Sequence, residues 1–161
     1  MQNTKKIPLP LEGGCQCGSL RYKCTKGPEV CYACHCKNCQ KSAGSAFQIS
    51  AIFEKSSVTL SGVTPKEWTF EADSGNKLVN LFCPECGTKV AAKKSDKPDL
   101  LTIKAGTLDD SALEWLDPIM HVWASKKMNW FDLPKDSKAI DKQPEESEMK
   151  EHIALWKERH E

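Results

Sequence analysis

The sequence predicts a mainly β domain that is followed by a short C-terminal helix. Up to about residue 134 the apolar segments are short, several alternate in the manner of strands, and turn signals separate them. Few segments before residue 135 carry a sustained helical period. In addition, eight of the nine cysteines fall into three tight clusters, a pattern typical of metal ligation.

Length and charge narrow the possible classes of protein. A chain of 161 residues suits one domain with a modest core. A net charge of +1 predicts neither a nucleic-acid partner nor binding to an anionic membrane. The apolar stretches are too short to span a bilayer, and the N-terminus lacks the apolar core of a signal peptide. We therefore expect a cytoplasmic protein, in which thiols stay reduced and serve as metal ligands rather than as disulfides.

The chain divides into three expected parts. Residues 1–11 are predicted to be a flexible leader, residues 12–134 the zinc-binding β domain, and residues 135–161 a charged amphipathic helix or tail. In the tail, apolar side chains recur at i, i+4 and i+7, and a proline is placed for the first helical turn. This helix either packs on its own domain, which we favour, or binds a partner. The residues concerned are Met149, Ile153, Trp156 and Pro144.

Short strands account for most of the β domain. Leu20–Cys24 alternates between apolar and polar residues, as a half-buried strand does. A hairpin is predicted where the turn signal Asp73–Asn76 separates Trp68–Phe70 from Leu78–Phe82, whose strand leads directly to Cys83. The other predicted strands are Phe47–Phe53, Ser57–Leu60, Leu100–Ala105 and His121–Trp123.

The cysteine spacings suit zinc. A Cys-x-Cys pair on extended backbone points both sulfurs to one side, as in Cys15-Gln-Cys17. A Cys-x-x-Cys pair needs a tight turn, and Cys83-Pro-Glu-Cys86-Gly has the Pro and Gly that favour one. The middle cluster is Cys31-Tyr-Ala-Cys34-His-Cys36-Lys-Asn-Cys39. Together the clusters offer enough soft ligands for two zinc ions.

Spacing alone leaves the allocation of ligands open. Cys83 and Cys86 can pair with Cys15 and Cys17 or with members of the middle cluster, and either choice gives a closed structural site. In the first case a Cys-x-Cys-x-x-Cys tripod remains, formed by Cys34, Cys36 and Cys39. Three protein ligands and one open position are typical of catalytic zinc.

Two residues compete for the fourth position of that tripod. His35 lies between two cysteines that face the same side, so we expect it to point away. Cys31 is the stronger competitor, and its spacing does not exclude it. An open site with three thiolates acidifies water weakly and suits a soft ligand, so its expected chemistry is the activation of a small-molecule thiol.

Four motifs, in order, resemble those of a known family. The first is Gly13-Gly-Cys-Gln-Cys-Gly-Ser-Leu-Arg-Tyr22, and the second is Cys34-His-Cys-Lys-Asn-Cys-Gln-Lys41, followed by Gly44-Ser-Ala-Phe47. The third is Phe82-Cys-Pro-Glu-Cys-Gly-Thr88, and the fourth is His121-Val-Trp-Ala-Ser-Lys126. On these residues the chain resembles the glutathione-dependent formaldehyde-activating enzyme family, which also includes centromere protein V.

The resemblance implies a fold, a ligand set and a reaction. The implied fold is a β-tent of antiparallel sheets stapled by zinc. The implied structural zinc ligands are Cys15, Cys17, Cys83 and Cys86, and the implied catalytic zinc ligands are Cys34, Cys36 and Cys39. The implied reaction joins glutathione to formaldehyde and forms S-hydroxymethylglutathione, in the class of carbon–sulfur lyases.

Other residues receive weaker predictions. Cys24 and Cys31 lie outside the matched ligand positions and are expected to be buried structural thiols. His121 is predicted to be a satisfied core histidine rather than a proton-transfer group. The loop residues Lys41, Ser42 and Ser45 either meet a glutathione carboxylate or are simply solvated.

Three hypotheses for function follow. The preferred one is a zinc enzyme that adds glutathione or a similar thiol to formaldehyde or a related small electrophile. The alternative is a non-catalytic, zinc-stabilised module that binds a protein, with the tail around Ile153 and Trp156 as its contact. A third reading has the second zinc closed by Cys31 and purely structural.

Overall fold

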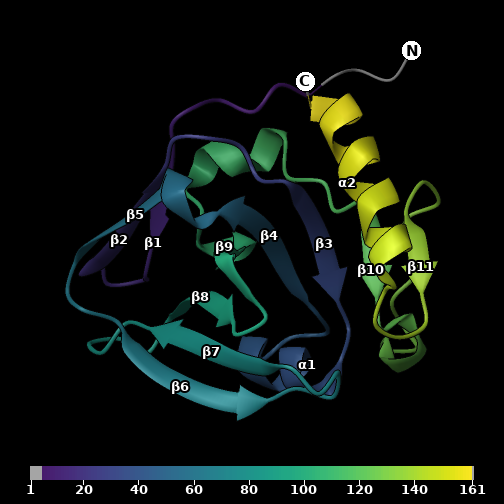
Figure 1. Ribbon diagram of the computed structural model, residues 1–161, viewed down its shortest axis with the longest axis horizontal. Helices are drawn as coiled ribbons and strands as arrows, with labels where there is room; N and C mark the ends of the chain where they lie inside the picture. The colour runs from purple at the N-terminus through teal and green to yellow at the C-terminus, as the bar shows by residue number, and fades with distance from the viewer. Residues whose placement is uncertain (1–4, 161) are drawn as a thin grey trace.

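The fold is built from two open β-sheets and two α-helices, and the computed structural model describes residues 5–160 (Figure 1). The smaller sheet has the strand order β1-β2-β5, and the larger has the order β11-β10-β3-β4-β9-β8-β7-β6. The strands of the smaller sheet are β1 (Leu11–Gly14), β2 (Leu20–Cys24) and β5 (Val58–Gly62).

The larger sheet holds most of the chain. Its strands in chain order are β3 (Val30–Cys34), β4 (Gln48–Glu54), β6 (Lys66–Glu71), β7 (Lys77–Phe82), β8 (Lys89–Lys94), β9 (Lys97–Lys104), β10 (Met120–Val122) and β11 (Lys138–Ile140). The helices are α1 (Lys37–Ala43) and α2 (Glu146–His160), with short 3₁₀ turns at Lys55–Ser57, Ala105–Thr107, Asp110–Glu114 and Ala124–Lys126. Neither α-helix in the described part of the chain has the length and apolar character needed to cross a membrane.

Antiparallel pairing dominates both sheets. Strand β10 is the exception among the described strands, because it pairs in parallel with β3 on one side and with β11 on the other. The predicted fold class, mainly β with a short C-terminal helix, is confirmed. The predicted strand Leu20–Cys24 has the bounds of β2, and the predicted hairpin is β6–β7, with Asp73–Asn76 in its connection.

The sequence pattern did not predict several elements of the fold. The strands β1, β3, β8 and β11 and the helix α1 were not predicted. Of the expected leader, residues 1–4 lie outside the described part. Leu11, at its other end, is fully buried and opens β1, opposite Cys24. The Lys5 amide also donates to the Arg159 carbonyl at 3.3 Å, so this segment contacts α2.

Helix α2 is docked on the domain. Trp156 is 1% exposed, and its indole Nε1 donates to the Pro28 carbonyl at 3.1 Å. Its ring meets Trp115 edge to face at 6.4 Å, and Figure 1 shows α2 lying beside β3 and β10. The helix begins two residues after Pro144, which therefore precedes the first turn rather than lying in it. Because Trp156 belongs to the core, it is not displayed as a contact for a partner.

Candidate metal centres and the adjoining pocket

Four thiols from two distant hairpin connections meet at the edge between the sheets. The sulfurs of Cys15, Cys17, Cys83 and Cys86 all lie within 4.8 Å of one another. Cys15 and Cys17 occupy the connection between β1 and β2, while Cys83 and Cys86 occupy the connection between β7 and β8. The group therefore joins the smaller sheet to the larger one.

Local backbone geometry points these thiols at each other. The Leu20 amide donates to the Cys15 sulfur at 3.2 Å. Gly87 has a φ of +75°, in the left-handed region that favours glycine, and its amide donates to the Cys83 carbonyl at 2.9 Å. Hydrogen bonding with Thr88 lowers the pKa of Cys86 to about 5, which favours the thiolate that binds a metal.

A second group of three thiols lies where β3 meets α1. The sulfurs of Cys34, Cys36 and Cys39 are within 4.8 Å of one another. Cys36 caps α1, since its sulfur accepts from the Cys39 amide at 3.3 Å. Gly44 ends the helix in the left-handed conformation, with φ 59°. The cap residue Cys36 and the first turn of this short helix thus bring the last two thiols back to the end of β3.

Cys31 and His35 do not join the three thiols. Side chains alternate along β3, so Cys31 and Cys34 face opposite sides of the sheet. Cys31 is fully buried in the core, and this burial raises its pKa, as expected for an inert structural thiol. His35 points away as predicted: its Nε2 lies 2.9 Å from Nδ1 of His121, and its ring packs against Phe47.

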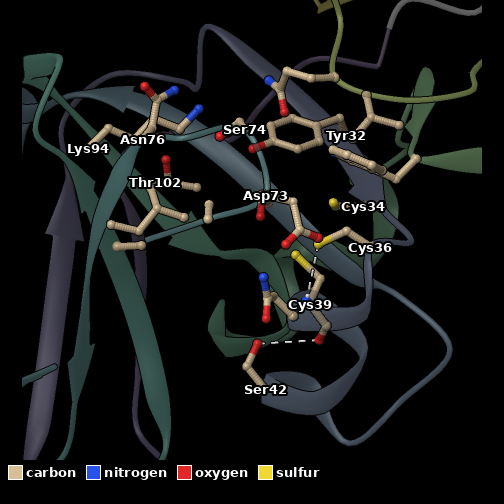
Figure 2. A pocket seen from close by; sticks show the side chains of 18 of the residues that line it. Tyr32, Cys34, Cys36, Cys39, Ser42, Asp73, Ser74, Asn76, Lys94 and Thr102 are labelled. Atoms are coloured by element: carbon tan, nitrogen blue, oxygen red, sulfur yellow. Dashed lines mark hydrogen bonds between the residues drawn. The ribbon is translucent and has the colours of Figure 1, made fainter. Parts of the chain in front are cut away.

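The three thiols open onto a pocket over one face of the larger sheet (Figure 2). Its floor contains polar side chains that neighbouring strands bring together, for Tyr32 is opposite Ser50 and Ser50 is opposite Lys104 in the strand registers. Beyond them Thr102 lies opposite Ala92, and Ala92 lies opposite Asn80. These floor residues are mostly polar and buried, whereas apolar side chains such as Phe70, Leu78 and Val122 supply much of the rest of the lining.

Two other segments complete the pocket wall. The tip of the β6–β7 hairpin contributes Asp73, Ser74 and Asn76, and Figure 2 shows Asp73 pointing toward Cys36 and Cys39. The stretch leading into α2 contributes Gln143 and Pro144, and the first turn of α2 contributes Met149. The C-terminal part of the chain thus forms part of the pocket rather than a separate tail.

Two lysines in this pocket were missed by the sequence reasoning. Lys104 is 8% exposed, and its ammonium group lies 3.4 Å from the Ser50 hydroxyl. Burial lowers the pKa of Lys104 to about 7. Lys89 donates to the Ser42 hydroxyl at 3.0 Å and to the Gln48 amide oxygen at 3.2 Å, and burial lowers its pKa as well. The signal was present: Thr102 and Lys104 alternate with apolar residues in the predicted strand.

Of the remaining candidate residues, one lines the pocket and the others lie outside it. Ser42 lines the pocket, whereas Lys41 and Ser45 are exposed and are not among its lining residues. His121 is 3% exposed and has His35 as its partner, so it is the buried, satisfied histidine that the sequence predicted. Cys24 is fully buried, and burial raises its pKa to about 12.

Fold and thiol geometry together define a class: a mainly β protein that can hold one metal ion with four cysteines and another with three. All nine cysteines are free thiols, and sulfur donors in such groups suit zinc. Residues 10–126 match the family described as glutathione-dependent formaldehyde-activating enzyme. The match covers well over half of the chain, so the protein belongs to this family.

Other comparisons add little. No protein of curated function matches the chain significantly. Among solved structures, a Rhodobacter sphaeroides protein is similar over 62% of this chain and 88% of its own, with 17% identity and a TM-score of 0.47. A likeness at this level supports no conclusion about function.

Proposed function

We propose that the protein is a zinc-dependent enzyme of the carbon–sulfur lyase class that adds a thiol, glutathione or one like it, to formaldehyde or a related small electrophile. The family supports a glutathione-dependent reaction with formaldehyde. In this proposal Cys15, Cys17, Cys83 and Cys86 hold a structural zinc, and Cys34, Cys36 and Cys39 hold a catalytic one.

One observation carries the proposal: the two thiol groups differ in completeness and in place. The four-thiol group offers all four ligands that a tetrahedral zinc ion needs, and it lies between the sheets. The three-thiol group gains no further cysteine or histidine from the described residues, and it lines a pocket. A metal site that is one ligand short and open to a pocket is built to accept a substrate.

The reaction needs little besides positioning and a thiolate. A zinc ion bound by three cysteines supplies a position for a soft ligand and promotes loss of the thiol proton. The sulfur forms a bond to the carbonyl carbon, the C=O π bond breaks toward oxygen, and that oxygen gains a proton. The overall change joins thiol and aldehyde with no atom lost. The pocket walls hold the two reactants together, which replaces a bimolecular encounter by an oriented one.

The test combines metal content with turnover. Cys36→Ser should leave the four-thiol ion in place, lose the other, and abolish thiol-dependent consumption of formaldehyde. Cys24→Ala is the matched control, because Cys24 is a buried thiol outside both groups. It should keep two zinc ions per chain and full turnover. If Cys36→Ser retained both zinc content and turnover, the assignment of the catalytic metal would be wrong.

The expected setting follows from the same chemistry. We propose a cytoplasmic location, because two thiolate sites need reduced cysteines. The proposed partners are the small-molecule thiol and aldehyde, with no nucleic acid. The alternative of a non-catalytic binding module predicts two zinc ions with no effect of glutathione on either, so zinc content measured with and without glutathione separates the two.

A further inference from the structure

The pocket beside the three thiols carries an excess of positive charge that the thiols would need. Apart from cysteine and tyrosine, its ionisable lining residues are Lys89, Lys94, Lys104 and Asp73. Within residues 5–160, no carboxylate lies within ion-pair distance of the ammonium group of any of these lysines. Lys104 and Lys89 instead have the neutral partners described above.

A buried ammonium group without a counter-ion is costly. Of the lysines in the pocket, Lys104 is the most deeply buried, and its Ser50 contact of 3.4 Å is long for a hydrogen bond. Folded proteins pair such charges or neutralise them. The one carboxylate in the pocket lining, Asp73, forms no ion pair with these lysines among the described residues, so the thiols are the remaining source of negative charge in the pocket. The position therefore suits an anion that arrives with the metal and the substrate.

The geometry places these lysines close enough to act on the metal group. In the sheet, one strand separates β9 from β3, and Lys104 lies level with Tyr32, so these two backbones are about 10 Å apart across the sheet and Cys34 follows two residues further along β3. A lysine side chain spans much of that distance. Burial lowers the pKa of Lys104, and negative charge on Cys39 and Cys34 opposes part of that lowering, which is consistent with this placement. Burial likewise lowers the pKa of Lys89, and negative charge on the same two cysteines and on Cys36 opposes that lowering.

The charges match in number. Three thiolates outweigh one divalent zinc ion by a single negative charge, and a substrate bound as thiolate adds a second. We propose that the ammonium groups of Lys104 and Lys89 balance these two charges and so allow the substrate thiol to bind as an anion in a largely buried pocket. This inference rests on the proposed function, and it assigns Lys104 and Lys89 as positioning residues rather than catalytic ones.

The test measures thiol binding directly, without turnover. In protein loaded with cobalt(II), the thiolate-to-metal absorbance reports both occupancy of the three-thiol site and the entry of a further thiol. Two thiols serve as probes: glutathione, which carries carboxylates, and 2-mercaptoethanol, which does not. The variants are Lys104→Met and Lys89→Met, since methionine keeps the length and apolar character of the stem while removing the charge. Lys97→Met is the control, because Lys97 lies on the same strand β9 and is exposed.

We expect Lys104→Met to fold as the wild type does, because a buried charge is replaced by an apolar group. Its binding of both thiols should weaken by roughly tenfold to a hundredfold, the effect of one nearby charge at an effective dielectric constant of about 20. Lys89→Met should weaken both in the same direction, and Lys97→Met should not.

Three results would overturn the inference. If only glutathione bound more weakly, Lys104 would be a carboxylate subsite rather than a counter-charge. If neither thiol were affected in Lys104→Met while the wild type bound both, the balance of charge would be wrong and the proposed function would stand. If neither thiol altered the wild-type cobalt spectrum, the proposed function itself would fail.

Discussion

Replacing Trp156 tests whether α2 belongs to the folded domain. The side chain is 1% exposed, contacts Trp115, and donates a hydrogen bond to the Pro28 carbonyl. Truncating a buried aromatic residue to alanine costs about 3–5 kcal/mol. Loss of the bond to Pro28 contributes about 1 kcal/mol of this. Since domains have only about 5–15 kcal/mol in total, Trp156→Ala should remove a large share of the stability.

The assay is urea unfolding of zinc-saturated protein, followed by the circular dichroism of the sheets. Leu155→Ala is the matched control, because Leu155 is the neighbouring residue on α2 and is 47% exposed. It should change the free energy of unfolding by less than about 0.5 kcal/mol. Equal and small effects of the two substitutions would refute the docked position of α2. They would also return the tail to the role of a partner-binding segment.

Three further predictions concern other parts of the fold. Gly62→Ala should lower the free energy of unfolding by about 2 kcal/mol or more, because Gly62 has a φ of +86° and an added Cβ would collide with the Ser19 carbonyl oxygen. Urea unfolding would measure this loss, and an unchanged unfolding midpoint would contradict it. Iodoacetamide should leave Cys24 unlabelled in the folded, zinc-loaded protein, because burial raises its pKa to about 12; rapid labelling detected by mass spectrometry would disprove its inertness. Asp109→Asn should cost less than about 1 kcal/mol, because the bidentate pair with Arg21 is largely exposed. Arg21 lowers the pKa of Asp109, so the pair's contribution is complete above the unfolded-state pKa of about 3.9 and is lost as pH falls through the folded-state pKa; a cost that grew toward acid pH would contradict this.

Local signals explain what the sequence predicted well. The β6–β7 hairpin was predictable because its turn residues lie between two alternating segments only a few residues away. The two thiol groups were predictable in outline for the same reason, since Cys-x-Cys and Cys-x-x-Cys spacings dictate which sulfurs can share an ion. Their allocation required the resemblance to a family, because spacing alone cannot say which distant pairs meet.

Features that depend on packing were not predictable. Helix α1 has seven residues and buries only Gln40 among them, so it shows no helical period. The segment from Cys31 to Cys39 was interpreted through its cysteines, as ligands and structural thiols, and no strand was predicted there, although its first half belongs to β3. Lys104 belongs to a predicted strand, but which of its faces lines a pocket follows from its pairing with β4, opposite Ser50. Pairing between strands far apart in sequence is information that no single segment contains.

The four-thiol group also constrains the order in which the protein can be completed. Its contact between Cys17 and Cys83 spans 66 positions of the chain. During synthesis the first pair of thiols is therefore made long before the second pair exists. In that interval Cys15 and Cys17 have no partners and are open to oxidation or to loss of a weakly held ion. The closed four-thiol site can form only after β7 and its following turn have been synthesised, because until then the smaller sheet cannot be joined to the larger one.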